Sequence, residues 1–180
     1  STSTAGLLDG SQYNPFTTIE AAVTAINSAT HEGDYTVNIA PGEYNITSTM
    51  RLTKNITFDK YYPTVDSTGE VIINGGINQI FYTPNDDKVY NINFQNLTLT
   101  NASTSYNGGV LAIYKYGNVN ITNCKIENNT VTADYQAGGA IYIGETGNVT
   151  CINTTFTSNT AKQYGGAILI WTGNVTCTDS

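Results

Sequence analysis

The sequence predicts an all-β fold, a right-handed parallel β-helix with coils of about 26–30 residues and three short strands per coil, led by an amphipathic helix. Three observations support this prediction. Segments of similar sequence begin at the Gly-Gly pairs of residues 108, 138 and 165, so they start 30 and then 27 residues apart. Apolar residues alternate with polar ones inside each segment. A single helical pattern precedes all of the segments.

The helical pattern occupies residues 14–27, NPFTTIEAAVTAIN. Its apolar residues share one face: Ile19, Ala22, Val23 and Ile26. Thr17 and Glu20 form the S/T-x-x-E pattern of a capping box, which predicts where the helix begins. Because the open end of a sheet stack exposes backbone and apolar side chains, we expect the helix to cover that end. Within a single domain, residues 1–35 then form the cap and residues 36–180 the coils.

The strands are predicted from three aligned segments, which are residues 108–130, 138–160 and 165–180. Residues 36–46, TVNIAPGEYNI, alternate in the same way around a Pro-Gly turn, and residues 90–102 match the second half of the unit. One unit cannot bury its apolar face alone, whereas stacking units about 4.8 Å apart brings equivalent residues into contact. The expected core columns are Leu111–Ile141–Ile168, Val119–Val149–Val175 and Ile121–Cys151–Cys177.

Asparagine recurs at one position of the unit, with an aspartate in the last copy: Asn96, Asn123, Asn153 and Asp179. Asn side chains in one column can hydrogen-bond from coil to coil, because a carboxamide both donates and accepts. We therefore expect an Asn ladder at an internal turn, although asparagine is common enough in this chain to align by chance.

The three cysteines are an odd number and include no C-x-x-C pair, so neither a zinc site nor a fully paired set of disulfides is expected within the chain. Cys151 and Cys177 occupy the same inward position of adjacent coils. They are either two buried thiols or, because stacked strands bring their Cα atoms close, a disulfide. Cys124 lies three positions off this column and is expected to be an unpaired core thiol.

The composition indicates an extracellular protein with uncharged polar faces. Charged residues make up 12% of the chain and the net charge is −7, with seven scattered basic residues, so a nucleic acid partner and anionic membranes are both disfavoured. No apolar run is long enough to span a membrane. The first ten residues, STSTAGLLDG, lack the basic start and apolar centre of a signal peptide.

Two stretches resemble known families. NPFTTIEAAVTAIN…DYTVNIAPGEYNI looks like the beginning of pectin-lyase-like β-helices, in which a capping helix precedes the first strand. GGAIYI…GNVTCINTTFTSNTA and YGGAILI…GNVTC resemble the repeats of adhesin-like surface proteins of methanogenic archaea, and are also similar to the GGAI repeats of chlamydial polymorphic outer-membrane proteins. The resemblance implies the fold and a cell-surface location, but β-helices carry many different functions.

No catalytic constellation is expected. β-Helix lyases and hydrolases need clustered carboxylates, whereas the acids here are scattered singly, with one arginine (Arg51) and one histidine (His31), which is expected to be solvated. The adjacent pair Asp86 and Asp87 is interpreted as a surface turn, with a Ca²⁺ ligand as the alternative. We therefore predict neither enzymatic activity nor a cofactor.

Nine N-x-S/T sequons are present. Two of them, at Asn96 and Asn153, belong to the expected ladder and should carry no glycan. The remaining glycosylation candidates are Asn45, Asn55, Asn101, Asn120, Asn128, Asn148 and Asn174. Among these, Asn120 should point outward from a strand, and Asn148 and Asn174 lie at turns.

Outward positions of the Gly-Gly strand, and the positions next to them, predict an exposed aromatic and aliphatic face: Ala112, Tyr114, Tyr142, Leu169 and Trp171. Such a face either binds sugars or protein partners or is an ordinary tyrosine-rich surface that stabilises neighbouring strands.

The leading functional hypothesis is a non-enzymatic, extracellular adhesin-like protein that contacts a host or microbial surface glycan or protein. The alternative is a structural subunit that self-associates head-to-tail through an open C-terminal coil. The chain stops mid-unit at Ser180, which is either a natural end or a truncation. A polysaccharide lyase or hydrolase ranks lowest.

Overall fold

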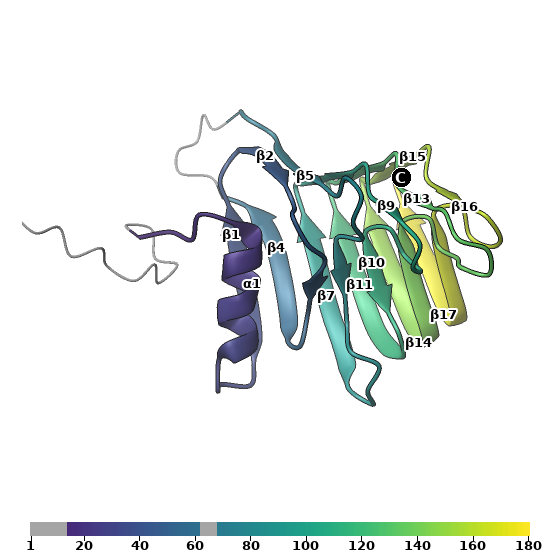
Figure 1. Ribbon diagram of the computed structural model, residues 1–180, viewed down its shortest axis with the longest axis horizontal. Coiled ribbons are helices and arrows are strands. Elements are labelled where there is room, and N and C mark those ends of the chain that lie inside the picture. The colour runs from purple at the N-terminus through teal and green to yellow at the C-terminus, as the bar shows by residue number, and fades with distance from the viewer. Residues whose placement is uncertain (1–13, 62–67) are drawn as a thin grey trace, which may run out of the picture.

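The computed structural model describes residues 14–61 and 68–180, and there it confirms the parallel β-helix (Figure 1). Strands stack side by side in successive coils, and all strand pairs among these residues are parallel. Helix α1 (Ile19–Ser28) stands against strand β1 (Asp34–Ile39) at one end of the stack, and the marked C-terminus lies at the other.

Helix α1 covers the end of the core as expected, but it begins later than predicted. Thr18 is its N-cap, and the Oγ1 atom of Thr18 accepts a hydrogen bond from the Ala21 N–H at 3.1 Å. The predicted capping box of Thr17 and Glu20 is wrong. The Glu20 carboxylate turns away from the helix start and accepts a hydrogen bond from the Thr47 N–H at 2.9 Å, which ties the helix to the first coil.

The largest sheet has nine strands, and two predicted strands of the repeat merge within it. Its order is β1-β4-β7-β11-β14-β10-β6-β3, with β17 paired to β14. The strands after β1 are β3 (Met50–Arg51), β4 (Asn55–Lys60), β6 (Phe81–Tyr82), β7 (Val89–Gln95), β10 (Leu111–Ile113), β11 (Tyr116–Thr122), β14 (Ile141–Ile152) and β17 (Ile168–Thr178). In β14 and β17, the predicted strand after the Gly-Gly pair and the predicted strand after the Gly-Asn turn form one continuous strand. For this reason β14 pairs with both β10 and β11.

Two smaller sheets form the other sides of the coils, and the smallest of them spans only three coils. The five-stranded sheet is the predicted third strand: β2 (Gly42–Asn45), β5 (Val71–Asn74), β8 (Thr98–Thr100), β12 (Lys125–Glu127) and β15 (Thr155–Thr157). The three-stranded sheet was not predicted: β9 (Ser103–Thr104), β13 (Thr130–Val131) and β16 (Thr160–Ala161). Strands of two residues leave no alternation in the sequence, so the pattern could not reveal them.

The predicted core columns are in register, but the prediction that Val175 and Cys177 lie in the core is wrong. Both are exposed, because β17 pairs only with β14 among the described strands. Leu111 pairs with Ile141 and Ile141 with Ile168, and the valine column and the Ile121–Cys151–Cys177 column pair in the same way. Nearer the helix, the rings of Phe58, Phe81 and Phe94 fill the core, with centroids 4.6 Å apart for Phe58–Phe81 and 5.7 Å for the other two pairs. All three rings are fully buried, so this part of the core is aromatic.

The Asn column that the sequence singled out forms a ladder, but at an exposed corner rather than at an internal turn. Asn153 donates from Nδ2 to Oδ1 of Asn123 at 2.9 Å, and Asn123 donates to Asn96 at 3.1 Å. Asn96 donates to Asp59 at 2.8 Å, which extends the ladder by one coil. The four residues of the predicted column have φ between 47° and 58°, a left-handed conformation that asparagine and aspartate adopt more readily than most residues: Asn96, Asn123, Asn153 and Asp179.

The internal asparagines are Asn129 and Asn159, which the sequence analysis missed. Asn129 is fully buried, and its Oδ1 accepts from the Ala102 N–H at 3.0 Å. Its Nδ2 donates to the Leu99 carbonyl at 3.2 Å and to Oδ1 of Asn159 at 2.9 Å. This carboxamide therefore satisfies backbone groups where the chain turns between two sheets and regular strand pairing stops.

Candidate functional site

The predicted aromatic face lies on the outer surface of the nine-stranded sheet. We call it the aromatic stripe and define it as Tyr82, Tyr114, Tyr142, Leu169 and Trp171. Tyr114 meets Tyr82 and Tyr142 edge to face, each with ring centroids 6.5 Å apart. The indole Nε1 of Trp171 donates to the Tyr142 hydroxyl at 3.3 Å, and Trp171 is 67% exposed. The stripe therefore crosses several coils as a run of contacting side chains.

Ala112 was expected in this exposed face, and that expectation is wrong. Ala112 is fully buried, although it is absent from the inner core cluster. Its register partners are Tyr82 on one side and Tyr142 on the other, so two large side chains flank one methyl group and cover it. Tyr82 itself escaped the sequence analysis because it precedes the clear repeats.

Gly144 leaves a gap in the stripe for a steric reason. A Cβ atom at Gly144 would overlap the carbonyl oxygen of Tyr114 in the neighbouring coil. Burial also raises the pKa of the Tyr114 hydroxyl above its ordinary value, so this phenol stays a neutral hydrogen-bond donor. The stripe consequently combines apolar rings with uncharged polar tips, which is the chemistry of many contact surfaces.

Rows of asparagine run beside the stripe on the same sheet, and several glycosylation candidates belong to them. Nδ2 of Asn148 donates to Asn118 at 3.0 Å, Asn174 donates to Asn148 at 3.4 Å, and Asn120 donates to Asn93 at 2.8 Å. Asn55 lies at the other end of the row that contains Asn118, Asn148 and Asn174. There it donates to Asp34 and accepts from the Asn91 N–H. In these asparagines, the Nδ2 atom to which a glycan would be attached therefore already donates a hydrogen bond to the neighbouring coil.

The other glycosylation candidates lie along the five-stranded sheet. Asn101 and Asn128 occupy a second left-handed corner, with φ of 56° and 58°, and Asn45 ends β2. Glycosylation at any of the seven sequons stays a prediction.

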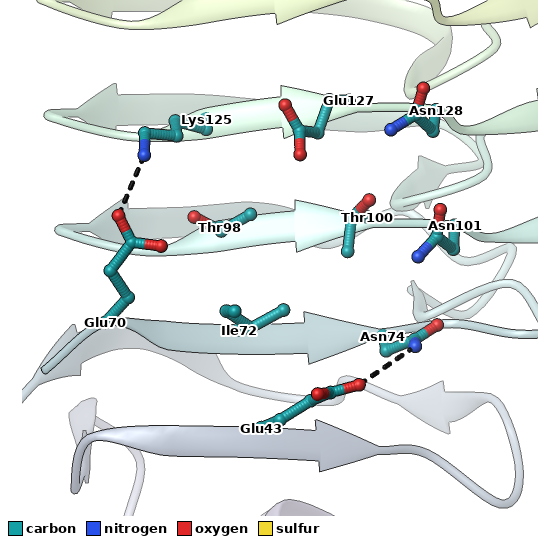
Figure 2. Close-up of a pocket in the computed structure, with 10 residues that line it drawn as sticks. All are labelled: Glu43, Glu70, Ile72, Asn74, Thr98, Thr100, Asn101, Lys125, Glu127 and Asn128. Atoms are coloured by element: carbon teal, nitrogen blue, oxygen red, sulfur yellow. Dashed lines mark hydrogen bonds and ion pairs between the residues drawn. The ribbon is translucent and has the colours of Figure 1, made fainter.

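The five-stranded sheet carries a shallow groove of about 330 Å³ that the sequence analysis missed (Figure 2). It is lined by Glu43, Glu70, Ile72, Asn74, Thr98, Thr100, Asn101, Lys125, Glu127 and Asn128. Three of the acids that were interpreted as scattered singly, Glu43, Glu70 and Glu127, therefore lie on one face. Residues far apart in the chain meet there because strand register, rather than sequence distance, sets which side chains are neighbours.

One of the carboxylates of this groove, Glu70, is held in an ion pair. Nζ of Lys125 lies 2.8 Å from Oε1 of Glu70, and both side chains are about half exposed. The hydrogen bond from Lys125, together with its charge, lowers the pKa of Glu70 below its ordinary value, so Glu70 stays ionised. A glycosidase needs a carboxyl with a raised pKa to protonate the leaving group, which is the opposite shift.

The described residues do not support the alternative that Asp86 and Asp87 are Ca²⁺ ligands. Asp86 accepts hydrogen bonds from the Tyr90 hydroxyl and the Lys88 N–H, and Asp87 pairs with Lys115 at 2.7 Å, as expected of a surface turn. Residues 14–61 and 68–180 contain no group of three His, Cys, Asp or Glu side chains placed to hold a metal ion. Within the same ranges, no helix has the length and apolarity needed to cross a membrane.

Cys124 and Cys151 are buried and Cys177 is exposed, and all three are free thiols in the structure. Burial raises the pKa of Cys124 to about 11. Burial, followed by the neighbouring Cys177, raises the pKa of Cys151 to about 12. Because only the thiolate is nucleophilic, both buried cysteines should react slowly near neutral pH.

We expect Ellman's reagent to label one thiol of the native protein rapidly, at Cys177, and to label all three after denaturation. The measurement is the absorbance change with and without urea. A single reactive thiol in the denatured protein would instead show that Cys151 and Cys177 are joined by a disulfide.

Part of the chain matches a known family model. Residues 153–170, which are 18 of the 180, match the model of the Chlamydia polymorphic membrane protein repeat. This segment runs from the Asn153 corner through β15 and β16 into β17. It is similar to the chlamydial repeat. No curated protein and no solved structure matches the chain. The resemblance to chlamydial repeats is thus supported for part of one coil, and the resemblance to archaeal adhesins and pectin-lyase-like proteins stays a prediction.

Proposed function

We propose that this chain is a non-enzymatic contact surface of an extracellular, adhesin-like protein, and that the aromatic stripe binds a partner on another cell. The observation that carries the proposal is the stripe itself. Strand pairing holds β6, β10, β14 and β17 in register, and every residue of the stripe lies on these strands except Tyr114, which directly follows β10. The surface is therefore preorganised and loses little conformational entropy on binding. Tryptophan and tyrosine are also the residues that most often dominate binding energy at protein interfaces.

A surface location is supported by the match to a repeat of a membrane protein family and by the composition. Charged residues make up only 12% of the chain, and asparagine and threonine cover the face beside the stripe. A polar border around an aromatic centre is the usual anatomy of an interface.

The proposal can be tested with fluorescent beads coated with the purified chain. The beads are mixed with cultured epithelial cells, with bacterial cells, and with no cells, and bound beads and bead clusters are counted by microscopy. We expect adhesion to at least one cell type, and no clustering of beads alone. Clustering without cells would favour self-association instead, and neither adhesion nor clustering would contradict a contact function.

A further inference from the structure

The floor of the groove on the five-stranded sheet is formed by two threonines whose hydroxyls lack partners. Thr98 and Thr100 project outward from β8, yet they are only 7% and 5% exposed. Neither hydroxyl makes a hydrogen bond with any residue that the structure describes. Both hydroxyls face the groove without a protein partner, so a polar ligand atom that reaches this floor can form hydrogen bonds with them.

The walls of the groove carry more negative than positive charge. Three carboxylates and one ammonium group line it, and Lys125 is paired with Glu70. This leaves Glu127 on β12 and Glu43 on β2 without a cation among the lining residues. Glu43 receives one long hydrogen bond from Nδ2 of Asn74, at 3.3 Å. An anionic ligand is therefore disfavoured and a cationic one attracted.

The shape of the groove favours a saccharide over a peptide. It crosses β2, β5, β8 and β12, and three strand spacings make about 14 Å. Strands β5 and β8 are hydrogen-bonded on both sides, so a peptide cannot be added there as a further strand. Ile72 is the one apolar residue of the lining, which leaves no pocket for apolar side chains. Carboxamides at Asn101 and Asn128 can both donate to and accept from sugar hydroxyls.

We propose that this groove binds a short linear oligosaccharide that carries free amino groups. The ammonium groups pair with Glu127 and Glu43, and the sugar hydroxyls bond with Thr98 and Thr100 and with the asparagines beside them (Figure 2). The groove lies on a different sheet from the aromatic stripe, so a negative result for saccharide binding would not contradict the proposed function.

The test is calorimetric titration of the whole chain with a glucosamine hexamer, compared with the N-acetylglucosamine hexamer, a galacturonic acid hexamer and spermine. We expect the glucosamine hexamer to bind, the acidic hexamer not to bind, and the acetylated hexamer to bind about tenfold more weakly. The double variant Thr98→Val/Thr100→Val should weaken glucosamine binding about tenfold, because it removes two hydrogen bonds and keeps the side-chain shape. Glu127→Gln should weaken it about fivefold.

The matched control is Thr155→Val/Thr157→Val, which changes the same two rows of the sheet on β15, outside the groove. It should leave the affinity within about twofold of the unsubstituted chain. Absence of glucosamine binding would overturn the proposal, and equal binding of the acetylated hexamer would overturn the role assigned to the amino groups. If spermine binds as tightly and the Thr98→Val/Thr100→Val variant loses nothing, the groove is a polycation site and not a saccharide site.

Discussion

Replacing Phe94 with alanine is expected to lower the free energy of unfolding by about 4 kcal/mol, the largest effect that we predict for a single substitution. Phe94 is fully buried, and its ring lies 5.7 Å from those of both Phe58 and Phe81. Removing it opens a cavity between coils whose backbones are locked in register, so the neighbours have little freedom to close the gap. Urea unfolding followed by circular dichroism measures the loss.

Phe156→Ala provides the control for this prediction. Phe156 packs against the same core cluster from β15, but it is only half-buried. Its removal should cost about half as much or less, because less apolar area leaves water on folding. If the two alanine variants lose equal stability, the aromatic cluster does not form the centre of the core.

Replacing Asn129 with alanine is expected to cost about 3 kcal/mol. The substitution deprives the buried Ala102 N–H of its partner, and it also breaks the bonds to the Leu99 carbonyl and to Asn159. Unsatisfied polar groups in a core are expensive, because they cannot regain hydrogen bonds from water. The same urea unfolding measurement applies.

Asn123→Ala is the matched control for Asn129→Ala. Asn123 bonds to Asn96 and Asn153 in a ladder of the same chemistry, but at an exposed corner where water can replace the carboxamide. Its loss should cost about 1 kcal/mol or less. A larger loss for Asn123→Ala than for Asn129→Ala would mean that the exposed ladder stabilises the stack more than the buried one.

The exposed and the buried asparagine columns differ in a property that could not be predicted from the sequence. The repeat alignment already paired Asn129 with Asn159, just as it paired Asn123 with Asn153, so both columns were visible in the sequence. Which column turns inward depends on the backbone at the corner. Asn123 and Asn128 adopt left-handed φ and project outward, and Asn129, the next residue, then points into the core. The order of residue types in the sequence does not determine this backbone conformation.

The core columns, in contrast, were predictable from the sequence, because strands that alternate with period two and repeat at a nearly fixed spacing can bury their apolar faces in only one register. The groove was not predictable. Glu43 and Glu70 lie in coils without the Gly-Gly repeat, so nothing aligned them with Lys125 and Glu127 before the strand pairing was known. The stripe was predicted apart from two residues. Ala112 is covered by the rings beside it, and Tyr82 precedes the clear repeats.

Our proposal assigns the cell contact to the aromatic stripe. The most direct test compares adhesion of beads coated with the Tyr142→Ser/Trp171→Ser variant and with the Tyr135→Ser/Tyr164→Ser variant, which removes two exposed tyrosines outside the stripe. Unfolding midpoints are measured first to show that both variants are folded. We predict that the stripe variant loses adhesion about tenfold or more, and that the control stays within about twofold of the unsubstituted chain. Equal adhesion of the two variants would contradict the claim.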